Sequence, residues 1–237
     1  MKKITALVLG MLLLLSCTAC DKNKQSNDTT PSNDSAAIGS NQNGSPEDET
    51  GMPAADITLA DVMNHSESPA DDFSWNDDGN GGLVLLKYLG DDEIVVIPEK
   101  VDGKSVTKIN KYAFANGTTM KGLKISSTIR VIDDFSIGNN TGLQYVVLGA
   151  GVEYIGESAF QSCTALKEVT INEGVKEIGK LAFGQCDSLK SVTLPESLET
   201  IGLFAFGGAS EGFKIIGKAG SVAETYAAEA SIPFEAK

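Results

Sequence analysis

The chain of 237 residues is long enough for one domain of moderate size together with unstructured segments. Its formal net charge of −13 argues against nucleic acid, or an anionic lipid surface, as a partner of the whole molecule. The charge is uneven, because residues 21–72 hold 11 acids and 2 lysines, whereas residues 73–237 hold 21 acids and 15 bases. A large part of the excess therefore precedes the region that has the composition of a folded domain.

Residues 1–20 have the features of a secretion signal. Two lysines are followed by an apolar run, residues 4–15, of about 12 residues, which is too short to span a bilayer but typical of a signal-peptide core. The following LLLLSCTAC resembles the lipobox of bacterial lipoproteins, in which the cysteine is lipidated and becomes the first residue of the mature chain. Cys17 fits this pattern better than Cys20, because two leucines and a serine precede it. An ordinary cleaved signal with incidental cysteines is the alternative.

Residues 21–71 predict a disordered acidic and polar linker, because they contain too few apolar side chains to offset the entropy lost on ordering. Such a segment would hold a folded body away from the membrane. A short helix is predicted around residues 59–63. His65, the single histidine of the sequence, is interpreted as a solvated linker residue. Its position excludes a Ser-His-Asp triad, a Cys-His pair or an HExxH zinc site from the folded domain.

The stretch WNDDGNGG, residues 75–82, lies between two strand-like runs. Its Asp-Gly step is typical of a hairpin turn. A calcium loop is the alternative reading of its clustered carboxylates, although they lack the alternate-residue spacing of calcium ligands.

A 23-residue period then runs through the chain, with five units between Ile94 and Gly212 and an insertion of about five residues near residues 101–104. Aligned apolar residues recur in successive units: Leu143, Leu166 and Leu189; Val146, Val169 and Val192; Leu148, Ile171 and Leu194; Ile155, Ile178 and Ile201; and Phe160, Phe183 and Phe206. One unit alone buries too few side chains to offset the ordering of its backbone, whereas stacked units cover one another's apolar faces. The period therefore predicts a solenoid in which the three phenylalanines form a column.

The motif L-x-x-V-x-I/L, followed by L-x-x-I-G-x-x-A-F-x-x-C, resembles the BspA-like class of leucine-rich repeats over residues 72–237. The resemblance implies a β-rich repeat solenoid that begins with a hairpin cap at residues 73–98 and ends with a helical cap. Ser221 and Glu224 fit an S-x-x-E capping box for that last helix. Val222, Tyr226 and Ala230 are expected on its buried face, and Pro233 is expected to stop it.

Cys163 and Cys186 occupy the same place in adjacent units, where Asn140 stands one unit earlier. We interpret them as small buried residues at a turn. A disulfide between them is an alternative, while a metal site would need further histidine or cysteine ligands.

The residues between the inward-facing positions of L-x-x-V-x-I are expected on one exposed sheet face. Such a stacked face is the natural recognition surface of a solenoid, and an aromatic side chain on it is typical of a binding hot spot. The alternative is a plain solvated face. Gly122 is expected on the same face but has no side chain to offer. The candidate binding residues are Lys124, Tyr145, Val147, Glu168, Thr170, Ser191 and Thr193.

These features predict a lipid-anchored, extracytoplasmic protein that binds an extracellular protein or glycan without catalysis. The resemblance implies the same, because BspA-like proteins include bacterial surface proteins implicated in adhesion. A structural envelope spacer or a docking subunit of a surface complex is the alternative. A carboxylate-pair glycosidase is a third possibility, but the exposed strand positions offer Glu168 and no evident partner. Neither cofactor, metal nor nucleic acid is expected, and the membrane is reached through the lipid anchor alone.

Overall fold

The computed structural model describes residues 56–114 and 119–237. The predicted signal segment, the lipidation candidates Cys17 and Cys20, and the linker up to residue 55 lie outside the described residues.

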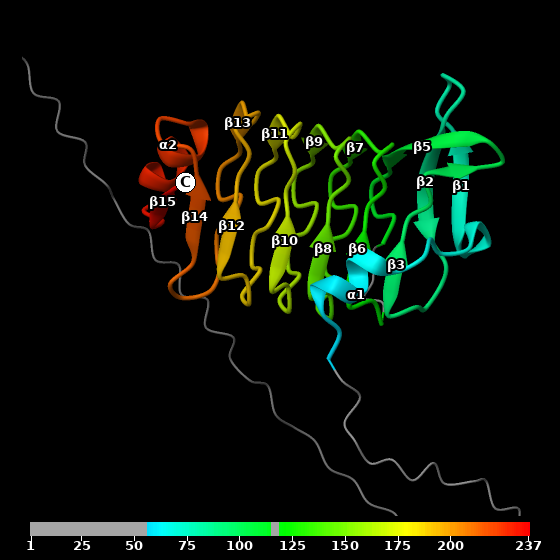
Figure 1. Ribbon diagram of the computed structural model, residues 1–237, viewed down its shortest axis with the longest axis horizontal. Coiled ribbons are helices and arrows are strands. Elements are labelled where there is room, and N and C mark those ends of the chain that lie inside the picture. The colour runs from blue at the N-terminus through cyan, green and yellow to red at the C-terminus, as the bar shows by residue number, and fades with distance from the viewer. Residues whose placement is uncertain (1–55, 115–118) are drawn as a thin grey trace, which may run out of the picture. The chain divides into compact units, whose positions relative to one another are not determined.

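The folded body is a solenoid in which two rows of short strands run along the stack of coils (Figure 1). The first row contains β3 (Ile94–Val96), β6 (Gly122–Lys124), β8 (Tyr145–Val147), β10 (Glu168–Thr170), β12 (Ser191–Thr193), β14 (Lys214–Gly217) and β15 (Phe234–Ala236). The second row contains β1 (Phe73–Asp77), β2 (Leu83–Tyr88), β5 (Lys104–Ile109), β7 (Val131–Ile132), β9 (Tyr154–Ile155), β11 (Glu177–Ile178) and β13 (Thr200–Ile201). The predicted β-rich repeat solenoid is therefore confirmed.

Neighbouring coils pair in parallel with the register that the sequence period predicts. Tyr145 is paired with Gly122 on one side and with Glu168 on the other, in steps of 23 residues. The stack is longer than the five predicted units, because β14 adds a further strand to the first row beyond Gly212. The insertion near residue 101 forms a small hairpin of β4 (Lys100–Val101) with β5, which turns at Asp102 and Gly103.

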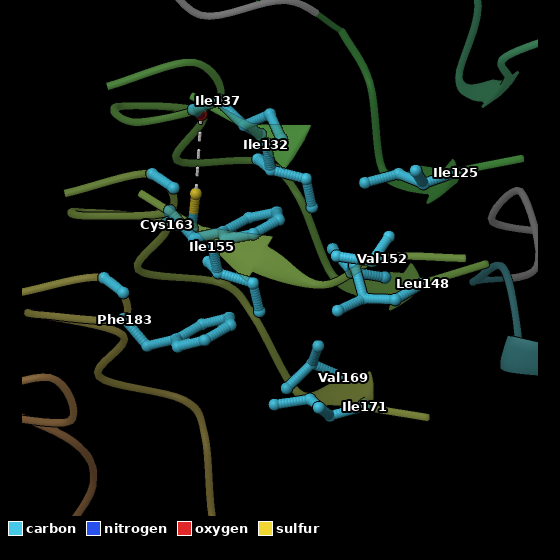
Figure 2. Close-up of a cluster of buried hydrophobic side chains, with 14 of the residues drawn as sticks. Ile125, Ile132, Ile137, Leu148, Val152, Ile155, Cys163, Val169, Ile171 and Phe183 are labelled. Atoms are coloured by element: carbon cyan, nitrogen blue, oxygen red, sulfur yellow. Dashed lines mark hydrogen bonds between the residues drawn. The ribbon is translucent and has the colours of Figure 1, made fainter. Parts of the chain in front are cut away.

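The recurring apolar side chains form one continuous core along the solenoid axis (Figure 2). Phe183 lies between the rings of Phe160 and Phe206, with centroids 5.0 and 5.3 Å apart and ring planes within 3° of parallel. The predicted phenylalanine column is confirmed. Each ring buries its two faces against its neighbours, so the core is shared between coils and is not complete within any one of them.

The glycine of each Ile-Gly step is explained by the close approach of successive coils. A Cβ added at Gly179 would lie 2.6 Å from the backbone nitrogen of Glu157, and one at Gly202 would lie 2.3 Å from that of Lys180. Real side chains do not approach backbone atoms so closely, so this corner of the coil requires glycine.

Cys163 and Cys186 are buried free thiols, as we interpreted them. The Sγ atom of Cys163 donates to the carbonyl of Ile137 at 3.7 Å (Figure 2). Cys186 donates in the same way to Phe160 O at 3.4 Å. In the preceding coil the side chain of Asn140 instead donates to Phe114 O at 2.9 Å. The side chain at this position therefore donates a hydrogen bond to a carbonyl of the preceding coil. A disulfide would remove the thiol hydrogens that make this bond in Cys163 and Cys186.

The N-terminal cap is the predicted hairpin of β1 and β2. Its turn is organised by the carboxylate of Asp78, which accepts the N–H groups of Asn80 and Gly82 at 2.7 and 2.8 Å and the hydroxyl of Thr107 at 2.8 Å. These hydrogen bonds hold the pKa of Asp78 below its usual range. The carboxylate is engaged in shaping the turn, which supports the hairpin interpretation of this stretch.

The C-terminal cap contains α2 (Val222–Glu229), but the predicted capping box is wrong. The Ser221 hydroxyl is buried and makes no capping bond, and Glu224 accepts the N–H of Gly220 at 2.6 Å in place of that of Ser221. The predicted buried face is also shifted, since Ala223, Tyr226 and Ala227 are the buried residues. The helix ends before Pro233, because Ser231 turns into the left-handed region at φ 56°.

The folded body begins earlier than the boundary at residue 72 that the composition predicts. The helix α1 (Leu59–Asn64) forms where a short helix is predicted, with a capping box between Thr58 and Asp61, and a 3-10 turn follows at Ala70–Asp72. Val62 of α1 is fully buried against the first row of strands. Ser68 also joins the segment to β3, since its N–H donates to Val96 O at 2.9 Å and its hydroxyl accepts the N–H of Val96 at 3.1 Å. A composition averaged over the linker conceals these few specific contacts.

Candidate functional site

The candidate residues lie on the outer face of the first row of strands, but α1 covers the N-terminal end of that face (Figure 1). Gly122, which alternation places on the exposed face, is buried, because Val62 of α1 fills the space above it. A Cβ at Gly122 would lie 2.4 Å from Val62 Cγ2. Lys124 is engaged by the same helix, since its Nζ donates to Met63 O at 2.7 Å. This end of the face is occupied by the chain itself.

Tyr145 and Val147 of β8 lie at the edge of the covered region and are half-buried. The Nζ atom of Lys167 stands 5.7 Å from the centroid of the Tyr145 ring and donates to Gln144 Oε1 at 2.8 Å. The ring and the ammonium therefore form one amphipathic patch, in which the cation lies over the ring at a distance typical of a cation–π contact.

Beyond β10 the first row separates into two sheets, one ending at β10 and the other beginning at β12. Elsewhere in the row, similar backbone hydrogen bonds join each strand to the next. The N–H groups of Gln144 and Tyr145 both donate to Lys121 O, at 2.7 and 3.1 Å, and Leu148 N–H donates to Thr170 O at 3.2 Å. At the β10–β12 step the corresponding N–H groups, those of Ile171, Lys190 and Ser191, have no such bond within the described residues.

A groove of about 350 Å³ marks this opening, which we call the β10–β12 groove. The two strands still approach within 8 Å between Cα atoms, so the groove is too narrow to admit a further strand. In the second row, β11 and β13 remain paired, so the coils separate on one side alone. The β10–β12 groove is lined by Lys167, Glu168, Val169, Thr170, Ile171, Ser191 and Thr193.

Four of the seven predicted binding residues therefore line one groove: Glu168, Thr170, Ser191 and Thr193. The hydroxyls of Thr170, Ser191 and Thr193 can donate and accept hydrogen bonds, and the carboxylate of Glu168 can accept them. The unpaired backbone N–H groups add further donors. Val169 and Ile171, almost fully buried, form an apolar floor. This arrangement suits a ligand that carries both polar groups and an apolar surface, such as a peptide or the face of a sugar.

Reactive chemistry has little support at this face. Among residues 56–114 and 119–237, no group of three histidine, cysteine or carboxylate side chains is placed to hold a metal ion. Glu168 has no second carboxylate among the other groove residues with which to form a catalytic pair. The cysteine thiols are buried, and burial raises the pKa of Cys163 to about 12, which suppresses the reactive thiolate.

The sequence analysis placed the candidate residues on one sheet face, but it missed both α1 above Gly122 and the opening at β10. Gly122 itself could have indicated the covering helix. The equivalent position holds Tyr145 and Glu168 in the next two coils, and a glycine there leaves room for another element to pack. No signal marks the opening at β10, because the segments LKEVTI and LKSVTL are nearly identical.

The fold, a shared core between short parallel strands repeated every 23 residues, defines a leucine-rich repeat solenoid. Residues 95–211 match the BspA type leucine rich repeat region, in six copies. A leucine-rich repeat protein of T. pallidum has a similar structure, with a TM-score of 0.60 and 27% identity over 64% of this chain and 71% of that one. Residues 95–211 of the solenoid are therefore leucine-rich repeats of the BspA type, as the motif suggested.

Two further structures are more distant. A leucine-rich repeat protein from Bacteroides ovatus is 26% identical with a TM-score of 0.48, over 63% of this chain and 39% of that one. A leucine rich cell surface protein from Faecalibacterium prausnitzii is 21% identical with a TM-score of 0.49, over 66% and 46%. The chain thus spans less than half the length of either. No curated protein matches the chain. Within the described residues, no helix is both long and apolar enough to cross a bilayer.

Proposed function

We propose that this protein is a lipid-anchored recognition protein that displays its solenoid outside the cytoplasmic membrane and binds an extracellular protein or glycan at the β10–β12 groove. The observation that carries the proposal is the opened step itself. Backbone N–H groups that the rest of the row pairs internally are left facing a groove lined by hydroxyls, with the Tyr145 and Lys167 patch on the neighbouring strand. Binding there requires contact complementarity and makes or breaks no covalent bond.

A binding array tests the site. The full chain is applied to immobilised matrix proteins and glycans, and any interaction is compared between the wild type, Thr193→Arg and Thr200→Arg. Both threonines are exposed and lie in short strands, but Thr193 lines the groove and Thr200 lies in the second row. We expect Thr193→Arg to fill the groove and weaken binding at least tenfold, which corresponds to about 1.4 kcal/mol, while Thr200→Arg binds as the wild type does.

Tyr145→Ala tests the adjoining patch, and it should lower affinity because it removes the aromatic anchor beside Lys167. Equal binding by the wild type, Thr193→Arg and Tyr145→Ala would move recognition away from this face. An array with no bound partner at all would instead favour the structural spacer.

The anchor is tested separately in membranes. The resemblance of LLLLSCTAC to a lipobox supports Cys17 as the lipidated residue. Cys17→Ala should abolish partitioning into the detergent phase, and Cys20→Ala should leave it intact, because each buried methylene of an acyl chain contributes about 0.8 kcal/mol of membrane affinity. The reverse result would assign the anchor to Cys20.

A further inference from the structure

The coils are joined along a third side by the turns that carry the Ala-Phe pairs. In each turn, N–H groups on alternate residues donate to carbonyls of the next coil. Those of Ser158, Phe160 and Ser162 donate to the following turn at 2.9, 2.7 and 2.8 Å. One coil later, those of Leu181, Phe183 and Gln185 donate to Leu203, Ala205 and Gly207 at 3.1, 2.7 and 2.7 Å. Each turn therefore needs a following turn to accept its hydrogen bonds.

The last turn of this series, residues 203–208, has no following turn. The hydroxyl of Tyr226, from α2, accepts the N–H of Phe206 at 3.3 Å. The N–H groups of Phe204 and Gly208, which hold the donor positions on either side, make no hydrogen bond within the described part of the chain. The cap therefore satisfies the middle donor and leaves the outer two unused.

A cavity of about 650 Å³, which we call the cap-end cleft, lies between this turn and the C-terminal cap. Its apolar walls include the nearly buried Phe206 and Phe213, and Ile232 and Pro233 from the loop after α2. Leu203 and Phe204 also line it, and they are 71% and 67% exposed, the most exposed large apolar side chains of the described residues. Two unused donors thus adjoin a cavity with apolar walls and an apolar rim.

We propose that the cap-end cleft binds an apolar peptide segment of a partner protein, whose backbone carbonyls accept hydrogen bonds from the two outer donors of the last turn. The repeat itself specifies the backbone of the occupant. The carbonyls of Leu203 and Gly207, four residues apart, accept the two outer donors of the turn before them, so a peptide with carbonyls four residues apart matches Phe204 and Gly208. This is the turn counterpart of strand addition at a sheet edge, where main-chain hydrogen bonds provide affinity and side-chain pockets provide specificity.

The probe is a blocked peptide that copies residues 179–187, GKLAFGQCD, with Cys186→Ser. It reproduces a turn that the chain stacks on its own turns, and its lysine and aspartate keep it soluble. It is titrated into the full chain while backbone amide NMR signals are recorded. We expect a Kd of about 1 mM or tighter, with the largest shifts at the amides of Phe204 and Gly208, and with slower amide hydrogen exchange at both.

Phe204→Asn provides the decisive variant, because asparagine tolerates the left-handed backbone of that position (φ 55°) while the apolar side chain at the rim of the cleft is removed. Tyr112→Asn is the matched control. Tyr112 occupies the same turn position in an early coil, has φ 60° and is 59% exposed. We expect Phe204→Asn to weaken peptide binding at least fivefold, and Tyr112→Asn to leave it unchanged.

Three results would overturn the proposal: no titration up to the solubility limit of the peptide, equal binding by Phe204→Asn, or shifts that avoid the amides of Phe204 and Gly208. The same titration with octanoate separates peptide from acyl-chain recognition, and octanoate binding without peptide binding would assign the cleft to lipid. Self-association of the full chain through this turn, detected by sedimentation and abolished by Phe204→Asn, would assign the cleft to a second copy.

Discussion

Replacing Phe183 with alanine should destabilise the solenoid more than any change at an exposed aromatic residue. The ring is fully buried and contacts Phe160 and Phe206 at centroid distances of 5.0 and 5.3 Å. Truncation of a buried phenylalanine costs about 3–5 kcal/mol, and each lost ring pair accounts for about 0.5–1.5 kcal/mol beyond burial. Because a domain of this size has a total stability of about 5–15 kcal/mol, the change removes a substantial fraction of it.

The measurement is urea denaturation followed by two probes. Far-UV circular dichroism reports all the coils, whereas the single tryptophan, Trp75, reports β1 in the N-terminal cap. Since each coil contacts its neighbours alone, loss of Phe183 should weaken the C-terminal coils first, so the two transitions separate. Phe204→Ala is the matched control: its ring is 67% exposed, and its effect should stay within about 0.5 kcal/mol. Equal midpoints for the two variants would refute the shared phenylalanine core.

Three other predictions concern the thiols, the Ile-Gly step and α1. Burial raises the pKa of Cys163 to about 12 and raises that of Cys186 as well, whereas an unfolded thiol ionises near 9. The unfolded state alone then loses these protons, so the free energy of unfolding should fall as pH rises above 9, and less steeply in a double Cys→Ser variant. Gly179→Ala should lower the urea midpoint far more than Gly142→Ala, whose Cβ would meet its nearest atom at 3.7 Å. Gly122→Val should dislodge α1 and accelerate amide exchange over residues 59–64.

The core could be predicted from the sequence because its interactions repeat. The phenylalanine column and the parallel register follow from a 23-residue spacing, since stacking is the one arrangement that buries the same face of every unit. The Ile-Gly step and the two cysteines were also informative, because each satisfies the same contact in coil after coil.

Features that occur once in the chain were harder to predict. The attachment of α1 depends on Val62 and the space above Gly122, two residues 60 positions apart that no repeat connects. The capping of α2 depends on whether Glu224 reaches Ser221 or Gly220, a difference of one residue that the S-x-x-E pattern does not resolve. No residue pattern that we recognised in the sequence indicates the opening between β10 and β12.

Both proposed sites occur where the repetition of the solenoid is interrupted. Along an intact row, backbone donors and acceptors are consumed by neighbouring coils, so the surface offers side chains alone. Among the described residues, the N–H group of Ser191 at the β10–β12 groove has no bond to the preceding coil, and that of Phe204 at the cap-end cleft has no bond to a following one. An unpaired donor that adjoins a cavity favours a ligand able to accept its hydrogen bond, because leaving it without a partner on desolvation is costly. A solenoid can therefore acquire specificity through its interruptions, and substitutions at these two places should change what the protein binds while the repeat core stays intact.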